Sequence, residues 1–157
     1  MKVIVPGSYD PVTLGHVDII RRAAEENEQV YAVIFVNPEK TYTFSLEDRV
    51  RMLILATDEF DNVLVSYSNG MVVDYMRDHG IEKIVKGYRN DTDYAYEMKQ
   101  AEFNMNYGGY ETELKKCNEA LDGISSTLAR EKIAGGESTE GILPKSVADY
   151  IAYITRA

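Results

Sequence analysis

Glycines, a hydroxyl and an imidazole gather in one short stretch near the N-terminus. Gly7 and Ser8 follow an apolar run, and Thr13, Gly15 and His16 open a helical pattern shortly afterwards. Glycine lets backbone approach a ligand closely, and the first turn of a helix presents free N–H groups that favour an anion. An imidazole there can donate a hydrogen bond to a phosphoryl oxygen. The stretch therefore indicates a phosphate site, with a plain strand-to-helix turn capped by His16 as the alternative.

A second stretch of this kind is Ser125-Ser126-Thr127, directly ahead of another helical run. Capping the helix needs only one such hydroxyl, so three in a row favour an anion site. Lys40, Lys86 and Arg89 add cations after two further apolar runs. A guanidinium binds phosphate as a fork and an ammonium binds it as a point charge. The alternatives are a solvated loop lysine for Lys40 and an ordinary charged turn for the other two.

The elements that must position these loops alternate in type. Strand patterns fall at 2–5, 30–36, 63–67 and 84–85, and helical patterns at 15–25, 45–56, 71–78, 93–106, 125–134 and 144–154. Such alternation predicts parallel strands joined by helical crossovers. We therefore expect a single α/β domain over residues 1–157, with a doubly wound parallel sheet of the Rossmann-like kind. Ligands of such sheets bind at the carboxyl ends of the strands, at the switch point.

Composition narrows the classes of function. The 157 residues carry a net charge of -9, which argues against a nucleic-acid partner. Local cations can still bind a phosphate, since screening acts over about 8 Å. The single cysteine, Cys117, excludes an intrachain disulfide and suits a reducing compartment. No signal-peptide pattern or membrane-spanning apolar run is visible, so the sequence predicts a cytoplasmic protein without a membrane partner.

The run GSYDPVTLGHVDII, residues 7–20, resembles the opening of the phosphopantetheine adenylyltransferase family. That family belongs to the nucleotidyltransferases with a Thr/His-x-Gly-His motif, which stands here as Thr13-Leu14-Gly15-His16. The family usually has Thr where this chain has Ser8, and either residue supplies a hydroxyl. The run from Ile124 to Arg130 also resembles the family motif that holds the triphosphate of ATP.

The resemblance implies an activity. It is the transfer of AMP from ATP to 4′-phosphopantetheine, which gives dephospho-CoA and pyrophosphate. The acceptor phosphate attacks the α-phosphorus directly, so catalysis consists of positioning and charge stabilisation. Mg²⁺ would accompany ATP without a dedicated protein metal site. The family also implies a homohexamer.

The resemblance assigns roles by position. His16 would stabilise the α-phosphate, Ser8 would orient the nucleophile, and Lys40 and Lys86 would bind the acceptor phosphate. Val72, in the run 69–75, matches the position that contacts the pantetheine arm, with an ordinary amphipathic helix start as the alternative for this run. The positions that match ATP contacts are Ser8, Tyr9, His16, Gly87, Tyr88, Arg89, Glu97, Leu121, Asp122, Gly123, Ile124, Ser125, Ser126 and Thr127.

Some positions depart from the family pattern. Lys86 stands where the family has Arg, and Ala95 where it has Glu. Residues 113–123 are far more polar than the buried strand and aromatic loop expected there. The segment 43–50 resembles a helix-starting stretch of the family, so we assign it to structure. Two other functions stay open: a related transferase, such as a cytidylyltransferase acting on a polyol phosphate, and a nucleotide-binding protein that has lost catalysis.

Overall fold

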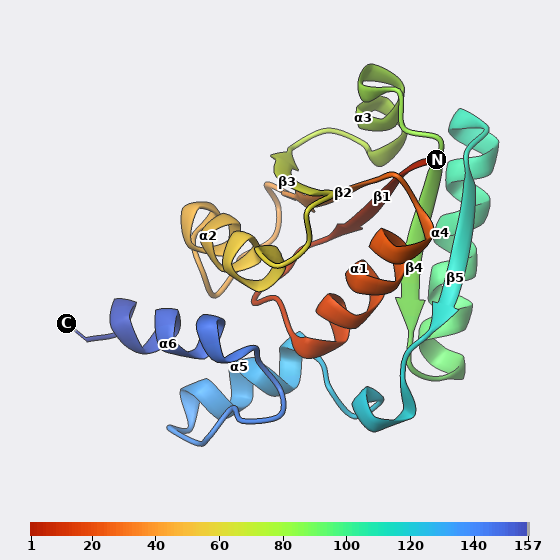
Figure 1. Ribbon diagram of the computed structural model, residues 1–157. Coiled ribbons are helices and arrows are strands. Elements are labelled where there is room, and N and C mark those ends of the chain that lie inside the picture. The colour runs from red at the N-terminus through yellow and green to blue at the C-terminus, as the bar shows by residue number, and fades with distance from the viewer. Residues whose placement is uncertain (157) are drawn as a thin grey trace.

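Five parallel strands form the centre of the molecule. The computed structural model describes residues 1–156, and its sheet has the order β3-β2-β1-β4-β5 (Figure 1). All four strand pairs are parallel. The strands are β1 (Lys2–Gly7), β2 (Gln29–Phe35), β3 (Val63–Ser68), β4 (Lys83–Tyr88) and β5 (Glu111–Lys116). This confirms the predicted doubly wound parallel sheet.

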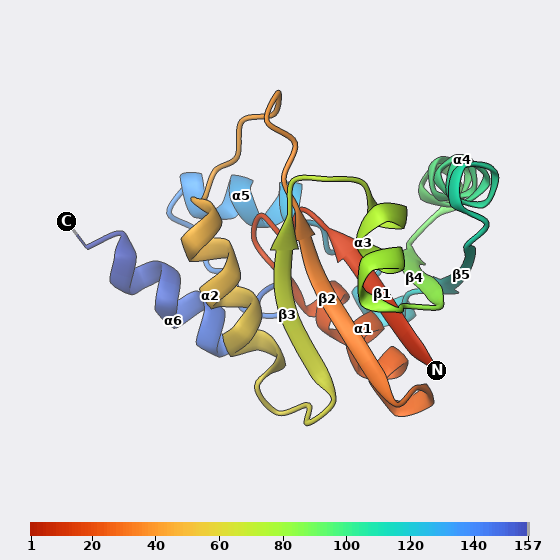
Figure 2. The same cartoon turned by 90° about the horizontal axis from the view of Figure 1, so that it is seen from above.

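Helices cover both faces of the sheet (Figures 1 and 2). They are α1 (Leu14–Glu26), α2 (Leu46–Thr57), α3 (Val72–His79), α4 (Asp91–Gly108), α5 (Ser126–Ala134) and α6 (Lys145–Ile154), with a 3-10 turn, η1 (Glu119–Leu121). Side chains of α1, α2, α5 and α6 share the larger core cluster, while α3 packs into the smaller cluster on the other face. α4 lies along α3, β4 and β5. Within the described residues, no helix combines the length and the apolar character needed to cross a bilayer.

The predicted elements all occur, with shifted bounds. β4 was expected only at 84–85, but it continues because Lys86 and Gly87 pair with Leu114 and Lys115 of β5. α4 begins at Asp91 and not at residue 93, because the Asn90 side chain caps it. Backbone pairing and a local cap therefore extend elements beyond their apolar patterns.

A glycine sets the distance between α1 and β4. A Cβ atom on Gly87 would lie 2.7 Å from Ile19 Cγ1, so a larger residue there would require the Ile19 side chain, or α1 with it, to shift. This close packing brings the first turn of α1 to the carboxyl end of β4. The residues predicted on these two elements therefore share one edge of the sheet.

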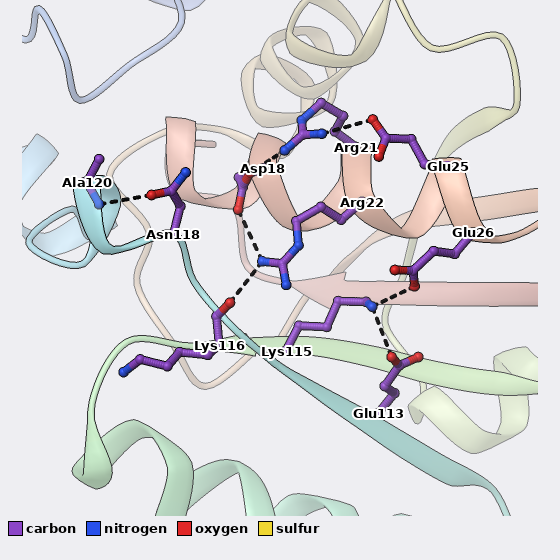
Figure 3. Close-up of polar contacts among 10 residues, drawn as sticks. All are labelled: Asp18, Arg21, Arg22, Glu25, Glu26, Glu113, Lys115, Lys116, Asn118 and Ala120. Atoms are coloured by element: carbon purple, nitrogen blue, oxygen red, sulfur yellow. Dashed lines mark hydrogen bonds and ion pairs between the residues drawn. The ribbon is translucent and has the colours of Figure 1, made fainter.

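The polar β5 strand carries ion pairs to α1 and β4 (Figure 3). Lys115 is buried, and its Nζ lies 2.6 Å from Glu26 Oε2 on α1 and 2.9 Å from Glu113 Oε2. Glu113 also accepts a 2.7 Å hydrogen bond from Lys83, and these two lysines lower the pKa of its carboxyl. The polar residues that depart from the family pattern thus form an edge strand whose α1-facing side is ion-paired instead of apolar.

The end of β5 is also fixed by α1. Arg22 Nη1 donates to the Lys116 carbonyl oxygen at 2.8 Å and to Asp18 Oδ2 at 3.3 Å (Figure 3). Cys117 follows at once, and its N–H donates to the Tyr88 carbonyl oxygen at 2.9 Å. These bonds hold the segment that leads from β5 toward α5.

Candidate active site

The main cavity lies where β1 and β4 end, on either side of the switch point of the sheet. Its volume is about 330 Å³, a size that suits a small-molecule site. The predicted site residues that line it are Ser8, Tyr9, His16, Lys86, Gly87, Tyr88, Arg89, Glu97, Leu121, Ile124, Ser125 and Ser126. Segments far apart in the sequence are therefore brought to one place, as the doubly wound topology requires.

His16 has a defined orientation and a defined tautomer. Its backbone N–H donates to Thr13 Oγ1 at 3.4 Å, while the Thr13 N–H donates to His16 Nδ1 at 3.0 Å. This is a capping box with imidazole in place of the usual Glu or Gln. Because Nδ1 accepts a hydrogen bond, the neutral ring carries its proton on Nε2. That N–H is the group that the ring can offer to a phosphoryl oxygen.

The charge state of His16 follows from its surroundings. Desolvation, followed by the positive charges of Lys86 and Arg89, lowers the pKa of the imidazole to about 4. The ring is therefore neutral at pH 7. A neutral donor beside two fixed cations can accommodate developing negative charge without first losing a proton.

Tyr9 shapes the loop after β1. Its backbone has φ 50, which is uncommon for a residue other than glycine. Its ring is buried, its hydroxyl donates to the Val5 carbonyl oxygen at 2.7 Å, and burial raises the pKa of that hydroxyl. The ring also lies 4.8 Å from the His16 ring, centroid to centroid. Tyr9 thus stabilises the loop through a hydroxyl already bonded to the protein.

Arg89 is held by a carboxylate that the sequence reasoning missed. Asp93 Oδ2 accepts from Arg89 Nε at 2.8 Å and from the Arg89 backbone N–H at 3.1 Å. Burial alone would raise the pKa of Asp93, but the hydrogen bonds and charge of Arg89 lower it. Asp93 stands four residues after Arg89, and that spacing could have indicated the pair. The hydrogen bonds to Asp93 hold the Arg89 guanidinium at the wall of the main cavity.

The N-terminus of α5 uses its hydroxyls for structure. Ser125 Oγ accepts from the Leu128 N–H at 3.0 Å, and Ser126 Oγ donates to the Pro11 carbonyl oxygen at 2.9 Å. Thr127 Oγ1 accepts from Arg130 Nη2 at 3.1 Å, and the same guanidinium donates to the Asp10 carbonyl oxygen at 2.8 Å. Capping by Ser125, one of the two interpretations of this run, is therefore correct. An anion would be bound here by backbone N–H groups of the first turn, which lack intrahelical partners.

A second, side cavity of about 230 Å³ adjoins the main one. The two share Pro6, Gly7, Ser8, Lys86, Tyr96 and Glu97. Beyond that boundary, the side cavity is lined by apolar Phe35, Val72 and Ile84 and by Gln100, Ala101, Asn104 and Thr112. The wall thus combines apolar surface with a few amide and hydroxyl groups. Val72 lies on this wall, and its contact with the acceptor stays a prediction.

Lys86 stands at the boundary of the two cavities. Its Nζ lies 3.2 Å from Glu97 Oε2 and donates to the Pro6 carbonyl oxygen at 3.3 Å. Glu97 is buried, whereas the other residues of α4 are at least partly exposed. The pair therefore places one cation and one carboxylate where the two cavities meet.

Several predicted residues lie away from both cavities. Lys40, Asp122, Gly123 and Thr127 are exposed and line neither one. Lys40 belongs to the connection between β2 and α2, which projects beyond the ends of the strands (Figure 2). The roles given to these residues stay predictions. Conversely, Asp10 and Asp93 line the main cavity and were absent from the predicted site, while Thr13 and Arg130, which belong to the predicted motifs, line it without having been given a role.

Comparison with known proteins agrees with this geometry. Residues 4–132 match the family model described as cytidylyltransferase-like. The chain is 38% identical to the phosphopantetheine adenylyltransferase of Thermobifida fusca over 148 residues, which cover 94% of this chain and 90% of that protein. It is 39% identical to the protein of the same name from Corynebacterium efficiens over 152 residues, 96% of each chain. The chain belongs to the phosphopantetheine adenylyltransferase family. The family resemblance of the sequence motifs is thereby confirmed.

The side chains of the site also bear on whether the protein itself could hold a metal ion. Among residues 1–156, no group of three or more His, Cys, Asp or Glu side chains is arranged to hold one. The main cavity is lined by the cations Lys86, Arg89 and Arg130. It is also lined by three carboxylates, but Asp93 and Glu97 are paired with Arg89 and Lys86, and Asp10 accepts from two backbone N–H groups. These residues suit an anionic ligand better than a protein-bound cation.

Proposed function

We propose that this chain transfers AMP from ATP to 4′-phosphopantetheine and releases dephospho-CoA and pyrophosphate. Two relatives matched over nearly their whole length carry the name phosphopantetheine adenylyltransferase. The main cavity would take ATP, with its triphosphate near His16, Arg89 and the first turn of α5. The side cavity would take the acceptor.

The observation that carries the choice of acceptor is the junction of the two cavities. Ser8 and Lys86 line both, so a phosphate at the boundary can face a nucleotide on one side and extend a tail into the other. The side cavity offers apolar groups at Phe35 and Val72 and polar groups at Asn104 and Thr112. A long amide-bearing tail fits such a wall, whereas a polyol phosphate has no tail to fill it. This favours phosphopantetheine over the acceptor of a polyol-phosphate cytidylyltransferase.

The chemistry needs no covalent intermediate. An oxygen of the acceptor phosphate forms a bond to the α-phosphorus, and the bond from that phosphorus to the bridging oxygen of pyrophosphate breaks. His16 Nε2–H donates to an α-phosphoryl oxygen as charge develops there. Lys86 and Lys40 bind the acceptor phosphate, and Ser8 orients it. Arg89, fixed by Asp93, binds the leaving phosphates.

We also propose the accompanying conditions. Mg²⁺ would be held mainly through triphosphate oxygens, because it keeps waters and phosphate ligands readily. A homohexamer would cover apolar side chains that α4 exposes, among them Tyr96, Phe103 and Tyr107. The reducing cytoplasm suits the single, buried Cys117.

A matrix of substrates tests the proposed function. ATP and CTP are each combined with 4′-phosphopantetheine and with glycerol 3-phosphate, and pyrophosphate release is measured. We expect release with ATP and 4′-phosphopantetheine. Release only with CTP and glycerol 3-phosphate would refute both the assignment of phosphopantetheine as acceptor and the assignment of ATP as nucleotide. No release with any pair would favour a nucleotide-binding protein without catalysis.

A further inference from the structure

Arg49 is a buried cation that joins two loops of the site. It lies in the first turn of α2, with 2% of its surface exposed. Its Nη1 donates to the Ser8 carbonyl oxygen at 3.0 Å, and its Nε donates to the Phe44 carbonyl oxygen at 3.1 Å. The guanidinium carbon also lies 4.0 Å from the centroid of the Tyr42 ring. One side chain thus binds the loop after β1 and the connection between β2 and α2.

The electrostatic setting of Arg49 is unusual. Within residues 1–156 no carboxylate lies within ion-pair distance of it, although other charged side chains of the molecule form such pairs. Burying a cation is costly unless its donors are satisfied, and carbonyl oxygens and an aromatic face do that here. An apolar residue could fill the same volume without this cost. Unlike an apolar residue, the guanidinium links the Ser8 and Phe44 carbonyl oxygens through hydrogen bonds.

A second contact joins the same two loops. The Asp10 carboxylate accepts from the Thr43 N–H and the Phe44 N–H, each at 2.9 Å. The base of the projecting segment is closed by the Asn37 N–H, which donates to the Tyr42 hydroxyl at 2.9 Å. The segment that carries Lys40 is therefore fixed at its base to the loop that carries Ser8, while its tip is exposed.

We propose that Arg49 is a positioning residue for phosphoryl transfer. It sets the distance between Ser8, at the boundary of the two cavities, and the segment from which Lys40 reaches the acceptor phosphate. The inference rests on the proposed function, because it concerns the alignment of the acceptor with the α-phosphorus. It replaces the purely structural assignment of residues 43–50. Arg49 does not itself touch the substrates, so its effect should fall on the acceptor step.

Two substitutions separate the bridge from the charge. Arg49→Lys retains a cation but loses the fork that reaches both carbonyl groups, and Arg49→Met loses both at similar volume. A displacement of about 1 Å in reacting groups can cost about 100-fold in rate. We expect each variant to lower kcat by roughly 10- to 100-fold and to raise the acceptor KM. The dissociation constant for ATP should stay within about twofold, because the triphosphate contacts proposed at His16, Arg89 and α5 lie outside the segments that Arg49 bonds.

The matched control is Arg51, two residues further along the same helix. It is exposed, and its ion-pair partner is Glu47 on the surface, at 3.3 Å. Arg51→Lys and Arg51→Met should therefore keep wild-type kcat and acceptor KM. Arg49→Lys with a kcat within about twofold of the wild type would overturn the proposal. Equal losses in ATP affinity and acceptor affinity would also overturn it, since that pattern reports general damage to the fold.

Amide hydrogen exchange gives a readout that does not depend on turnover. Segments 8–10 and 37–45 should exchange faster in Arg49→Lys than in the wild type and in Arg51→Lys, while α5 stays unchanged. Unchanged exchange in these segments would show that Arg49 does not link the two loops. This outcome does not depend on which substrate the wild type accepts. A wild type that releases no pyrophosphate with any acceptor refutes the proposed function instead, so the two failures can be told apart.

Discussion

Removing the imidazole of His16 should separate catalysis from helix capping. His16→Ala loses the Nε2–H donor and also the Nδ1 acceptor of the Thr13 N–H. Loss of one donor to developing charge costs about 10²–10³ in rate, or roughly 3–4 kcal/mol. Loss of half of a capping box costs about 1 kcal/mol of stability, which lowers Tm by roughly 2–4 °C in a chain of this size. The effect on turnover should therefore greatly exceed the effect on folding.

His16→Gln is the matched variant. Gln is a usual residue at this capping-box position, so it can restore the bond to Thr13 without placing a donor where Nε2–H lies. We expect His16→Gln to recover the Tm of the wild type and to remain as slow as His16→Ala. The assay is pyrophosphate release under saturating substrates, with ATP affinity measured separately by calorimetry. Turnover of either variant within about threefold of the wild type would refute the role of His16.

Contacts at Ser126, Lys86, His16 and Lys115 each give a measurable outcome. Ser126→Pro should weaken ATP binding by tenfold or more in calorimetry, since it deletes a first-turn N–H. Ser126→Ala loses only the bond to Pro11 and should bind ATP nearly as well as the wild type. Equal ATP affinities of the two variants would contradict a role for this N–H. Lys86→Ala should raise the acceptor KM at least tenfold, and it should lower Tm because Glu97 loses its cation. Lys86→Arg should keep or improve acceptor affinity. A normal acceptor KM in Lys86→Ala would exclude Lys86 from the acceptor site. Between pH 6.5 and about 4 the unfolded chain binds a proton at His16 that the folded protein does not, so stability should fall by at most about 3 kcal/mol as pH drops through this window, and denaturant melts of His16→Gln should lack this part of the fall. Lys115→Leu should leave the ATP KM unchanged and Tm equal or higher, because an apolar side chain avoids burying the cation and the carboxylates left behind, Glu26 and Glu113, are exposed enough to be hydrated. A large fall in Tm would show that the ion pairs carry the stability of β5.

The sequence predicted the sheet and the loops around the main cavity because their signals are local. Apolar runs mark β1 to β4, and Gly7, Gly15 and His16 mark a turn with helix-starting chemistry. The parallel topology then brings the loops after β1 and β4 together at the switch point. These inferences needed only the order of the elements.

The residues that hold the site in place could not be predicted in the same way. Arg49 reaches Ser8 across 41 positions and Arg130 reaches Asp10 across 120, and no local pattern encodes either contact. The polarity of β5 departs from the family pattern without a local explanation, because the partner of Lys115, Glu26, lies on a helix 89 positions away. Long-range hydrogen bonds to backbone carbonyls leave no periodic signal in a single sequence.

Identification of the reaction product tests the central claim most directly. Purified protein is incubated with ATP, Mg²⁺ and 4′-phosphopantetheine, and the products are separated and identified by mass spectrometry. We expect dephospho-CoA and pyrophosphate in equal amounts, with no AMP attached to the protein at any time. An adenylylated protein would contradict direct transfer, and the absence of dephospho-CoA would contradict the proposed reaction.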